Sequence, residues 1–185
     1  EKIKVTGNTV IDSLLTVSMK VDSDLSGYVE NFSNEHGIYF DTQKTILVTG
    51  HRRESFGRGF ENICKAIKHI AEKNSVQIIY PVHLNPKVQD PVKRILGDLP
   101  NVHLIPPQGY VPFIFLMKKA HIILTDSGGV QEEAPSLGKP VLVMRDTTER
   151  QEGIEFGTAK LVGTDLETII SHVESLLNDQ SEYDK

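Results

Sequence analysis

The chain has one cysteine and no tryptophan in 185 residues. A lone thiol excludes an intrachain disulfide, and no set of Cys and His residues has the spacing of a zinc site. Cys64 lies within the helical pattern of residues 60–67, so we interpret it as a core side chain and not as a nucleophile. We therefore expect no metal site and a reducing compartment, for which the cytoplasm is the simplest assignment.

Basic charge and long apolar runs are also scarce. Lys and Arg number 20 against 25 Asp and Glu, which gives a formal net charge of −5. Nucleic-acid-binding domains usually carry a basic field, so we expect no nucleic-acid partner and a local site for any bound anion. No apolar run approaches the roughly 20 residues of a membrane span, and no signal-peptide core follows the charged residues 1–4, so we expect no membrane partner.

The common phosphate-binding and nucleophile motifs are absent from the sequence. It contains no Walker Gly-Lys-Ser/Thr turn, no Gly-x-Gly-x-x-Gly turn and no Gly-x-Ser-x-Gly elbow. The run Gly57-Arg58-Gly59 is too short to count as any of these. We therefore expect no cofactor, and we interpret the Ser127 hydroxyl as a hydrogen-bond donor to a bound phosphate and not as a nucleophile.

Short β-rich apolar runs alternate with helical patterns along most of the chain. Strands separated by crossover helices predict an α/β fold with a doubly wound, parallel six-stranded sheet covered on both faces. The expected strands are residues 45–48, 76–80, 102–105, 121–124, 141–144 and 160–162. The expected helices are about residues 59–72, 86–96, 111–119, 130–137 and 166–177.

The first forty residues fit this alternation less well. Residues 5–19 have the apolar spacing of an amphipathic helix, with Thr6 or Asn8 as its cap, and a second helix is expected near residues 25–32. We therefore divide the chain into a peripheral helical and linker segment, residues 1–40, and a Rossmann-like domain, residues 41–185. We expect such a domain to be one half of a larger protein.

Ser127, Gly128 and Gly129 stand between an expected strand and an expected helix. Backbone N–H groups at such a turn can approach an anion, and the helix macrodipole favours its negative charge. The glycines could instead serve only the tight turn geometry. The sequence that follows this turn, through residue 140, is more specific evidence for a nucleotide site than the glycines alone. Neighbouring helix residues point about 100° apart, so one of Glu132 and Glu133 should face the cleft. We expect Glu133 to accept hydrogen bonds from ribose hydroxyls.

Basic side chains follow the first expected strand. Arginine presents a planar fork to phosphate oxygens, and His51 can donate to a bridging or leaving oxygen, so the run His51-Arg52-Arg53-Glu54 suits a diphosphate. The alternative is a solvated basic turn in which Glu54 pairs with an arginine. The carboxyl ends of parallel strands bind ligands in such folds, which favours the functional interpretation.

Three other strand ends carry candidate residues. His83 could contact a ligand or only anchor a strand-to-helix turn. Gln108 and Phe113 flank a loop that could hold a planar base, although Phe113 could equally belong to the core. Residues 145–150, ending at Arg150, mix both charge signs and suit a sugar with its phosphate, whereas surface salt bridging is the alternative.

Four of these motifs together resemble the non-hydrolysing UDP-N-acetylglucosamine 2-epimerases. The motifs are residues 49–54, 81–86, 126–135 and 144–150, and the resemblance runs from residue 5 to about residue 177. It implies a two-domain enzyme of the GT-B type, with the active site between two Rossmann-like domains, of which this chain would be the C-terminal, UDP-binding one. It further implies interconversion of UDP-N-acetylglucosamine and UDP-N-acetylmannosamine by elimination and re-addition of UDP, in the biosynthesis of cell-surface polysaccharides.

The resemblance also implies roles for individual residues. His51 and Arg150 would act on the diphosphate and sugar as catalytic residues. Ser127, Gly128 and Gly129 would hold phosphate, Glu133 the ribose, and Gln108 and Phe113 the uracil region. Arg52 and His83 would fall where some family members bind a second, activating UDP-N-acetylglucosamine.

The N-terminal domain that supplies the proton-transferring acids in that family is not in this sequence. We therefore expect the isolated chain to fold and bind UDP weakly without epimerising, and the full-length protein to be a homodimer. Two other functions stay open at this point, the donor-binding half of a GT-B glycosyltransferase and a non-catalytic nucleotide-sugar sensor. A hydrolysing epimerase relative also stays open, because trapping of UDP depends on the absent domain.

Overall fold

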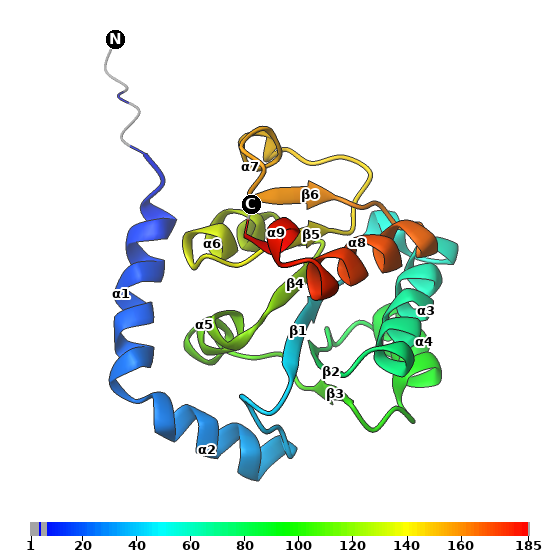
Figure 1. The fold of residues 1–185 in the computed structure, drawn as a ribbon, viewed down its shortest axis with the longest axis horizontal. Helices are drawn as coiled ribbons and strands as arrows, with labels where there is room; N and C mark the ends of the chain where they lie inside the picture. Colours follow the sequence, from blue (N-terminus) through cyan, green and yellow to red (C-terminus); the bar gives the residue numbers. More distant parts are fainter. Residues whose placement is uncertain (1–3, 5–6, 185) are drawn as a thin grey trace.

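A computed structural model describes residue 4 and residues 7–184 of the chain, and it contains one twisted parallel sheet between two layers of helices (Figure 1). The sheet has six strands in the order β3-β2-β1-β4-β5-β6, all parallel, which confirms the predicted fold class. The order reverses between β1 and β4, where doubly wound sheets place their ligands. The strands are β1 (Lys44–Thr49), β2 (Val76–Pro81), β3 (Val102–Ile105), β4 (Ile122–Thr125), β5 (Val141–Val143) and β6 (Ala159–Leu161).

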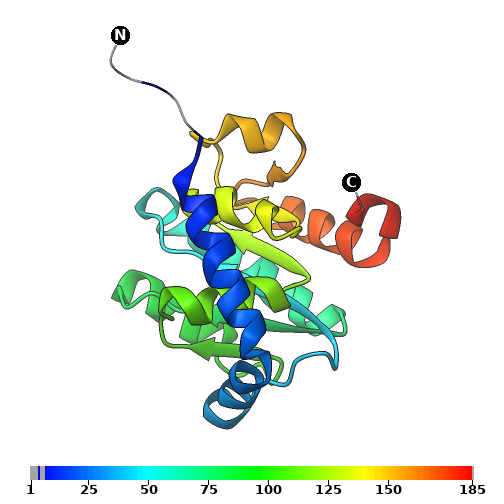
Figure 2. The same ribbon diagram turned by 90° about the vertical axis from the view of Figure 1, so that its left-hand side faces the viewer.

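Alternate side chains of each strand point to opposite faces and build two separate cores. Ile46 and Val48 of β1 pack in the first core with α3, α4 and α8. Leu47 packs in the second core with α1, α2, α5 and α6. Figures 1 and 2 show these two layers on either side of the sheet. The helices of the first layer are α3 (Arg58–Lys73), α4 (Pro86–Leu96) and α8 (Leu166–Asn178), and those of the second are α1 (Thr9–Ser23), α2 (Leu25–His36), α5 (Tyr110–Lys119) and α6 (Gly128–Ser136).

The N-terminal helix α1 lies along α5 and α6 on the outside of the second layer (Figure 2). The Asn8 side chain accepts a hydrogen bond from the Val10 N–H, which identifies Asn8 as the N-cap. The predicted start of this helix and its alternative cap, Thr6, lie outside the described residues. Leu14 and Val21 of α1 are fully buried, so this segment contributes to the second core.

Three short helices were not predicted. They are η1 (Arg53–Ser55), α7 (Gln151–Glu155) and α9 (Gln180–Tyr183), each too short to show a helical repeat of apolar residues. Three residues separate the η1 turn from the end of β1, so it helps to shape the edge of the sheet at the carboxyl ends of the strands. Across the part of the chain that the structure describes, none of the helices has the length and apolar character to cross a membrane.

Cys64 is fully buried in α3, as expected of a core residue. Burial raises the pKa of its thiol to about 12, although nearby Arg94 opposes the shift. The thiolate is therefore scarce near neutral pH, which is typical of an inert structural cysteine.

Candidate functional site

The site is built where β1 and β4 end side by side. Thr49 and Thr125 are register partners at the last position of the two strands, and their hydroxyl oxygens lie 2.6 Å apart. The Thr125 hydroxyl also accepts a hydrogen bond from the Ser127 N–H at 3.0 Å. These contacts bring the segment after β1 and the turn before α6 to the same edge of the sheet.

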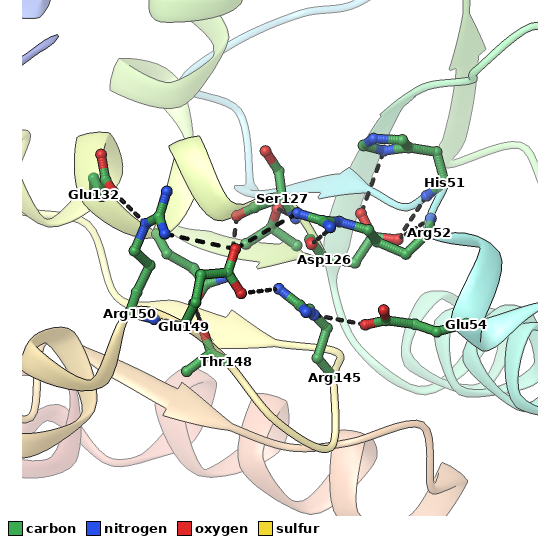
Figure 3. A network of polar contacts seen from close by, with 12 residues as sticks. His51, Arg52, Glu54, Asp126, Ser127, Glu132, Arg145, Thr148, Glu149 and Arg150 are labelled. Carbon is green, nitrogen blue, oxygen red and sulfur yellow. Dashed lines mark hydrogen bonds and ion pairs between the residues drawn. The ribbon is translucent and has the colours of Figure 1, made fainter.

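Asp126 connects the two segments. Its side chain is fully buried, and its Oδ2 accepts hydrogen bonds from the His51 N–H at 2.6 Å and from the Arg52 N–H at 2.7 Å. Its Oδ1 lies 3.3 Å from Nδ1 of His51. The Arg52 Nε donates to the Asp126 backbone oxygen at 3.2 Å. One buried carboxylate therefore fixes both the backbone after β1 and the imidazole that projects from it (Figure 3).

Helix α6 begins at this edge with Ser127 as its N-cap. The Ser127 side chain makes no capping hydrogen bond to the helix, so the free N–H groups of the first turn are not satisfied by it. Gly128 is buried and Gly129 is exposed. A helix start whose first-turn N–H groups are not capped by the Ser127 side chain is a suitable place for an anion.

A hollow of about 250 Å³ opens between the ends of β1, β2, β3 and β4. Five of the residues predicted from sequence line it: His51, His83, Gln108, Phe113 and Ser127. A second hollow of about 420 Å³ lies next to it. The second hollow is lined by His51, Arg52, Arg53, Glu54, His83 and Asn85.

The two histidines share the boundary of these hollows. The rings of His51 and His83 stack with centroids 5.3 Å apart and planes 11° apart. Nδ1 of His83 accepts a hydrogen bond from the Asn85 N–H at 3.1 Å, and Asn85 caps α4. His83 therefore anchors the strand-to-helix turn and also lines both hollows, so the two interpretations of this residue are compatible.

Gln108 and Phe113 occupy the rim of the smaller hollow. The Gln108 Nε2 donates to the backbone oxygen of Pro106 at 2.8 Å, which curls the side chain over its own loop. Phe113 is partly buried and also packs against the second core. It thus serves the core and the rim together.

The two acids of α6 point in different directions, as the helical repeat predicts. Glu133 is buried, and its Oε1 accepts a hydrogen bond from the Tyr110 hydroxyl at 2.8 Å. Burial and the contact with Glu133 raise the pKa of Tyr110 to about 12. Glu132 instead forms an ion pair with Arg150 and accepts a hydrogen bond from Asn8. Neither Glu133 nor Arg150 lines the two hollows.

Arginines and acids alternate across the mouth of the site (Figure 3). Glu149 pairs with Arg145 at 2.8 Å and lies 3.6 Å from Arg150 and 3.9 Å from Arg52. Arg145 also donates to Glu54 at 2.7 Å. The salt bridging considered from the sequence is therefore present. The same guanidinium groups remain within reach of an anion, because the Arg52 and Arg150 side chains are 35% and 38% exposed.

The ion pairs shift two pKa values. Burial alone would lower the pKa of Arg145, but its hydrogen bonds to Glu54 and Glu149 raise the pKa above its ordinary value. A hydrogen bond from its own backbone and another from Arg145 lower the pKa of Glu149. Both groups are therefore held in their charged forms.

Asp126 and Glu149 were not singled out as site residues, although both lie within the quoted motifs. Their contacts join residues from different strand ends, so the order of the strands must be known before the contacts can be predicted. Within residues 7–184, no group of three or more His, Cys, Asp or Glu side chains is placed to hold a metal ion.

A hollow larger than either of the two that His51 lines lies away from this chemistry. It measures about 670 Å³ and is bordered by the starts of β5 and β6 and by α9. It is thus at the amino ends of the strands. We assign the site to the smaller hollows because they lie at the carboxyl ends, beside the reversal of strand order.

Comparisons with known proteins identify the family to which the chain belongs. The family model described as UDP-N-acetylglucosamine 2-epimerase matches residues 1–185. The UDP-N-acetylglucosamine 2-epimerase of Escherichia coli strain K12 is 60% identical over 183 residues, which cover 98% of this chain and 48% of that protein. The chain therefore spans about half the length of the curated relatives it matches.

Two solved structures are similar to this chain. The UDP-GlcNAc 2-epimerase of Neisseria meningitidis, bound to UDP-GlcNAc, matches with a TM-score of 0.92 and 47% identity, covering 99% of this chain and 49% of that one. The UDP-GlcNAc 2-epimerase of Methanocaldococcus jannaschii, in complex with UDP-GlcNAc and UDP, matches with a TM-score of 0.79 and 35% identity. That match covers 97% of this chain and 49% of the other one.

The parallel sheet and its helical layers define a Rossmann-like domain of the kind found in GT-B-type nucleotide-sugar enzymes. Within that class, the family model and the sequence identity decide the assignment. The chain belongs to the UDP-N-acetylglucosamine 2-epimerase family.

Proposed function

We propose that this chain is the UDP-binding, C-terminal half of an enzyme that interconverts UDP-N-acetylglucosamine and UDP-N-acetylmannosamine. The observation that carries the proposal is the junction of β1 and β4, where Asp126 holds the His51 and Arg52 backbone against the start of α6. Residues 41–185 would form this domain and residues 1–40 its linker and peripheral helices. About half of each relative's length lies outside the match, which leaves room for a second domain.

In the proposed reaction, a proton leaves carbon 2 of the sugar while the bond from carbon 1 to the diphosphate oxygen breaks. UDP and an unsaturated acetamido sugar result. A proton then arrives at the opposite face of carbon 2, and UDP re-forms its bond to carbon 1. This domain would stabilise the negative charge that develops on the diphosphate and keep the anion in place.

Each residue predicted from sequence has a place in this proposal. The Ser127 hydroxyl and the N–H groups of Gly128 and Gly129 would bind phosphate, while His51 and Arg150 would face the diphosphate and sugar. Gln108 and Phe113 would contact the uracil, and Glu133 would turn from Tyr110 to the ribose. Arg52 and His83, on the second hollow, would serve a second nucleotide-sugar.

The chain alone would lack the groups that move the carbon 2 proton, since general acid–base catalysis needs them within hydrogen-bond reach. We expect it to bind UDP but not to exchange that proton. The test is incubation of the purified chain with UDP-N-acetylglucosamine in D₂O, followed by NMR of the sugar. Deuterium at carbon 2, or UDP-N-acetylmannosamine, would contradict the proposal that the acids lie in another domain.

The full-length protein, which we expect to be a homodimer, separates epimerase from the alternatives. Without any acceptor it should scramble the configuration at carbon 2 and keep UDP attached to the product. A donor-binding half of a glycosyltransferase, or a nucleotide-sugar sensor, would leave the substrate unchanged. A hydrolysing relative would release free N-acetylmannosamine.

A further inference from the structure

The hydrogen bonds from the His51 and Arg52 backbone use only one of the two carboxylate oxygens of Asp126. Oδ2 accepts two N–H groups, whereas Oδ1 is buried and makes no hydrogen bond within the described part of the chain. Nδ1 of His51 lies 3.3 Å from that oxygen. A buried acceptor without a donor is costly, so the imidazole is the group placed to satisfy it.

We infer that Asp126 is a positioning residue that keeps the proton of His51 on Nδ1 and so presents Nε2 to the ligand. If Nδ1 were unprotonated, its lone pair would face a buried carboxylate at 3.3 Å. A proton on Nδ1 replaces that repulsion with an attraction to the carboxylate, which favours a charge-assisted hydrogen bond between the two groups. The nitrogen bonded in this way selects the tautomer of the whole ring.

Two further contacts fix the orientation of the ring. The His51 backbone N–H donates a hydrogen bond to the same carboxylate, so one buried group holds both the main chain and the side chain of His51. The stacked ring of His83 limits rotation of the imidazole plane. Nε2 is on the side of the ring away from Asp126, and the His51 side chain is 42% exposed and lines both hollows.

The consequence for the reaction rests on the proposed function. With Nδ1 committed to Asp126, Nε2 is the position at which a proton can be donated to, or recovered from, a diphosphate oxygen. Without Asp126 the ring could reverse its tautomer, and its orientation toward the hollow would be lost.

The variant Asp126→Asn separates this role from a merely structural one. The amide oxygen can still accept the His51 and Arg52 N–H groups, so the backbone after β1 is retained. The amide NH₂ then faces Nδ1 and can only donate, which forces the His51 proton onto Nε2. An Asp-to-Asn change beside a histidine preserves geometry and reverses the tautomer in this way.

The direct measurement is a long-range ¹H–¹⁵N correlation spectrum of the imidazoles, recorded at about pH 8.5, where an ordinary histidine is neutral. The His51 signals are assigned from their loss in His51→Gln. We expect Nδ1 to carry a proton in the wild-type chain and Nε2 alone to carry it in Asp126→Asn. The exposed Asp90 of α4 supplies the control Asp90→Asn, which should leave the His51 signals unchanged.

A wild-type His51 protonated on Nε2 alone would overturn the inference, and this result does not depend on the variant folding. The same tautomer in the wild type and in Asp126→Asn would also overturn it. Unchanged backbone amide shifts of Arg52 in the variant would show that the turn is intact.

UDP titration of the wild-type chain tests the proposed function separately. A wild-type chain that binds no UDP would contradict the proposed function, while the imidazole spectrum would still decide the role of Asp126.

Discussion

The carboxylate of Glu149 lies against the first residue of α6, with its Oε1 2.9 Å from the position that a Cβ on Gly128 would take. Nitrogens of Arg52 and Arg150 lie 3.6 and 3.7 Å from the same position. An anionic group among arginines thus already occupies the region of the helix start where we place a phosphate. Glu149 is 45% exposed, so its side chain has room to turn away when a phosphate enters.

Replacing Glu149 with Gln should tighten UDP binding. The change removes a negative charge that competes with the diphosphate for Arg52 and Arg150, and we expect a gain of about two- to fivefold, the magnitude of an exposed ion pair. Calorimetric titration at low and high salt measures it, and the gain should shrink at high salt. Glu152→Gln, on the exposed side of α7, is the matched control. Weaker binding by Glu149→Gln would instead show that Glu149 orders the arginines for the ligand.

Gly128→Ala should impair UDP binding without harming the fold. The added methyl would meet only the flexible end of Glu149 at less than 3 Å, and alanine is a better helix former than glycine. It would, however, stand between an incoming phosphate and the helix amides. We expect the affinity for UDP to fall about tenfold, the size of a lost hydrogen bond to a charged group, with no loss in the melting temperature. Gly153→Ala, whose methyl makes ordinary contacts, is the control, and undiminished affinity in Gly128→Ala would contradict the phosphate placement.

Glu133→Gln should distinguish ribose recognition from phosphate recognition. The glutamine oxygen can still accept the Tyr110 hydroxyl, so the local structure is retained. Binding of UDP should weaken about tenfold because a charged acceptor is lost, whereas binding of inorganic pyrophosphate should not change. Ser127→Ala should weaken both ligands. Equal effects of Glu133→Gln on both would place this carboxylate near the phosphates and not at the ribose.

Much of this fold follows from local sequence patterns. The predicted helix at residues 86–96 matches α4, which begins with Asn85 as its cap and a proline in the first turn. The strand at residues 102–105 also matches β3. Both predictions depend on apolar spacing and flanking residues, which are present within a few positions of the chain.

The contacts at the site could not be predicted in the same way. Asp126 and His51 are 75 positions apart, and they meet only because β1 and β4 are neighbours in the sheet. Periodicity indicates that strands exist but not their order. Family resemblance located the motifs, but it did not specify that Glu149 lies against Gly128.

Tyr80→Phe should destabilise the edge that carries the site. The Tyr80 ring is fully buried, and its hydroxyl donates to the Gly50 backbone oxygen at 2.9 Å. The variant leaves that oxygen without its donor, so we expect the free energy of unfolding in urea to fall by about 1–3 kcal/mol. Tyr39→Phe, at an exposed residue, is the control. An unchanged unfolding midpoint would show that water replaces the hydroxyl.

The same variant should alter the alkaline stability profile. Burial raises the pKa of Tyr80 well above its ordinary value. In the unfolded chain the pKa of a tyrosine is about 10. Because the pKa of Tyr80 is higher in the folded state, the contribution of its neutral hydroxyl to the free energy of unfolding is complete below about pH 10 and declines as the pH rises above that value. The difference in stability between wild type and Tyr80→Phe should therefore narrow above about pH 10. A constant difference up to pH 11 would contradict this account.

The most direct test of the account is a UDP titration of the ¹⁵N-labelled chain followed by its backbone amide signals. If the nucleotide binds at the junction of β1 and β4, the largest shifts should fall on His51, Arg52 and residues 127–130, and Ser127→Ala should reduce them. The alternative location is the larger hollow at the starts of β5 and β6. Shifts concentrated on residues 139–142 and 157–160, with residues 127–130 unaffected, would contradict the account.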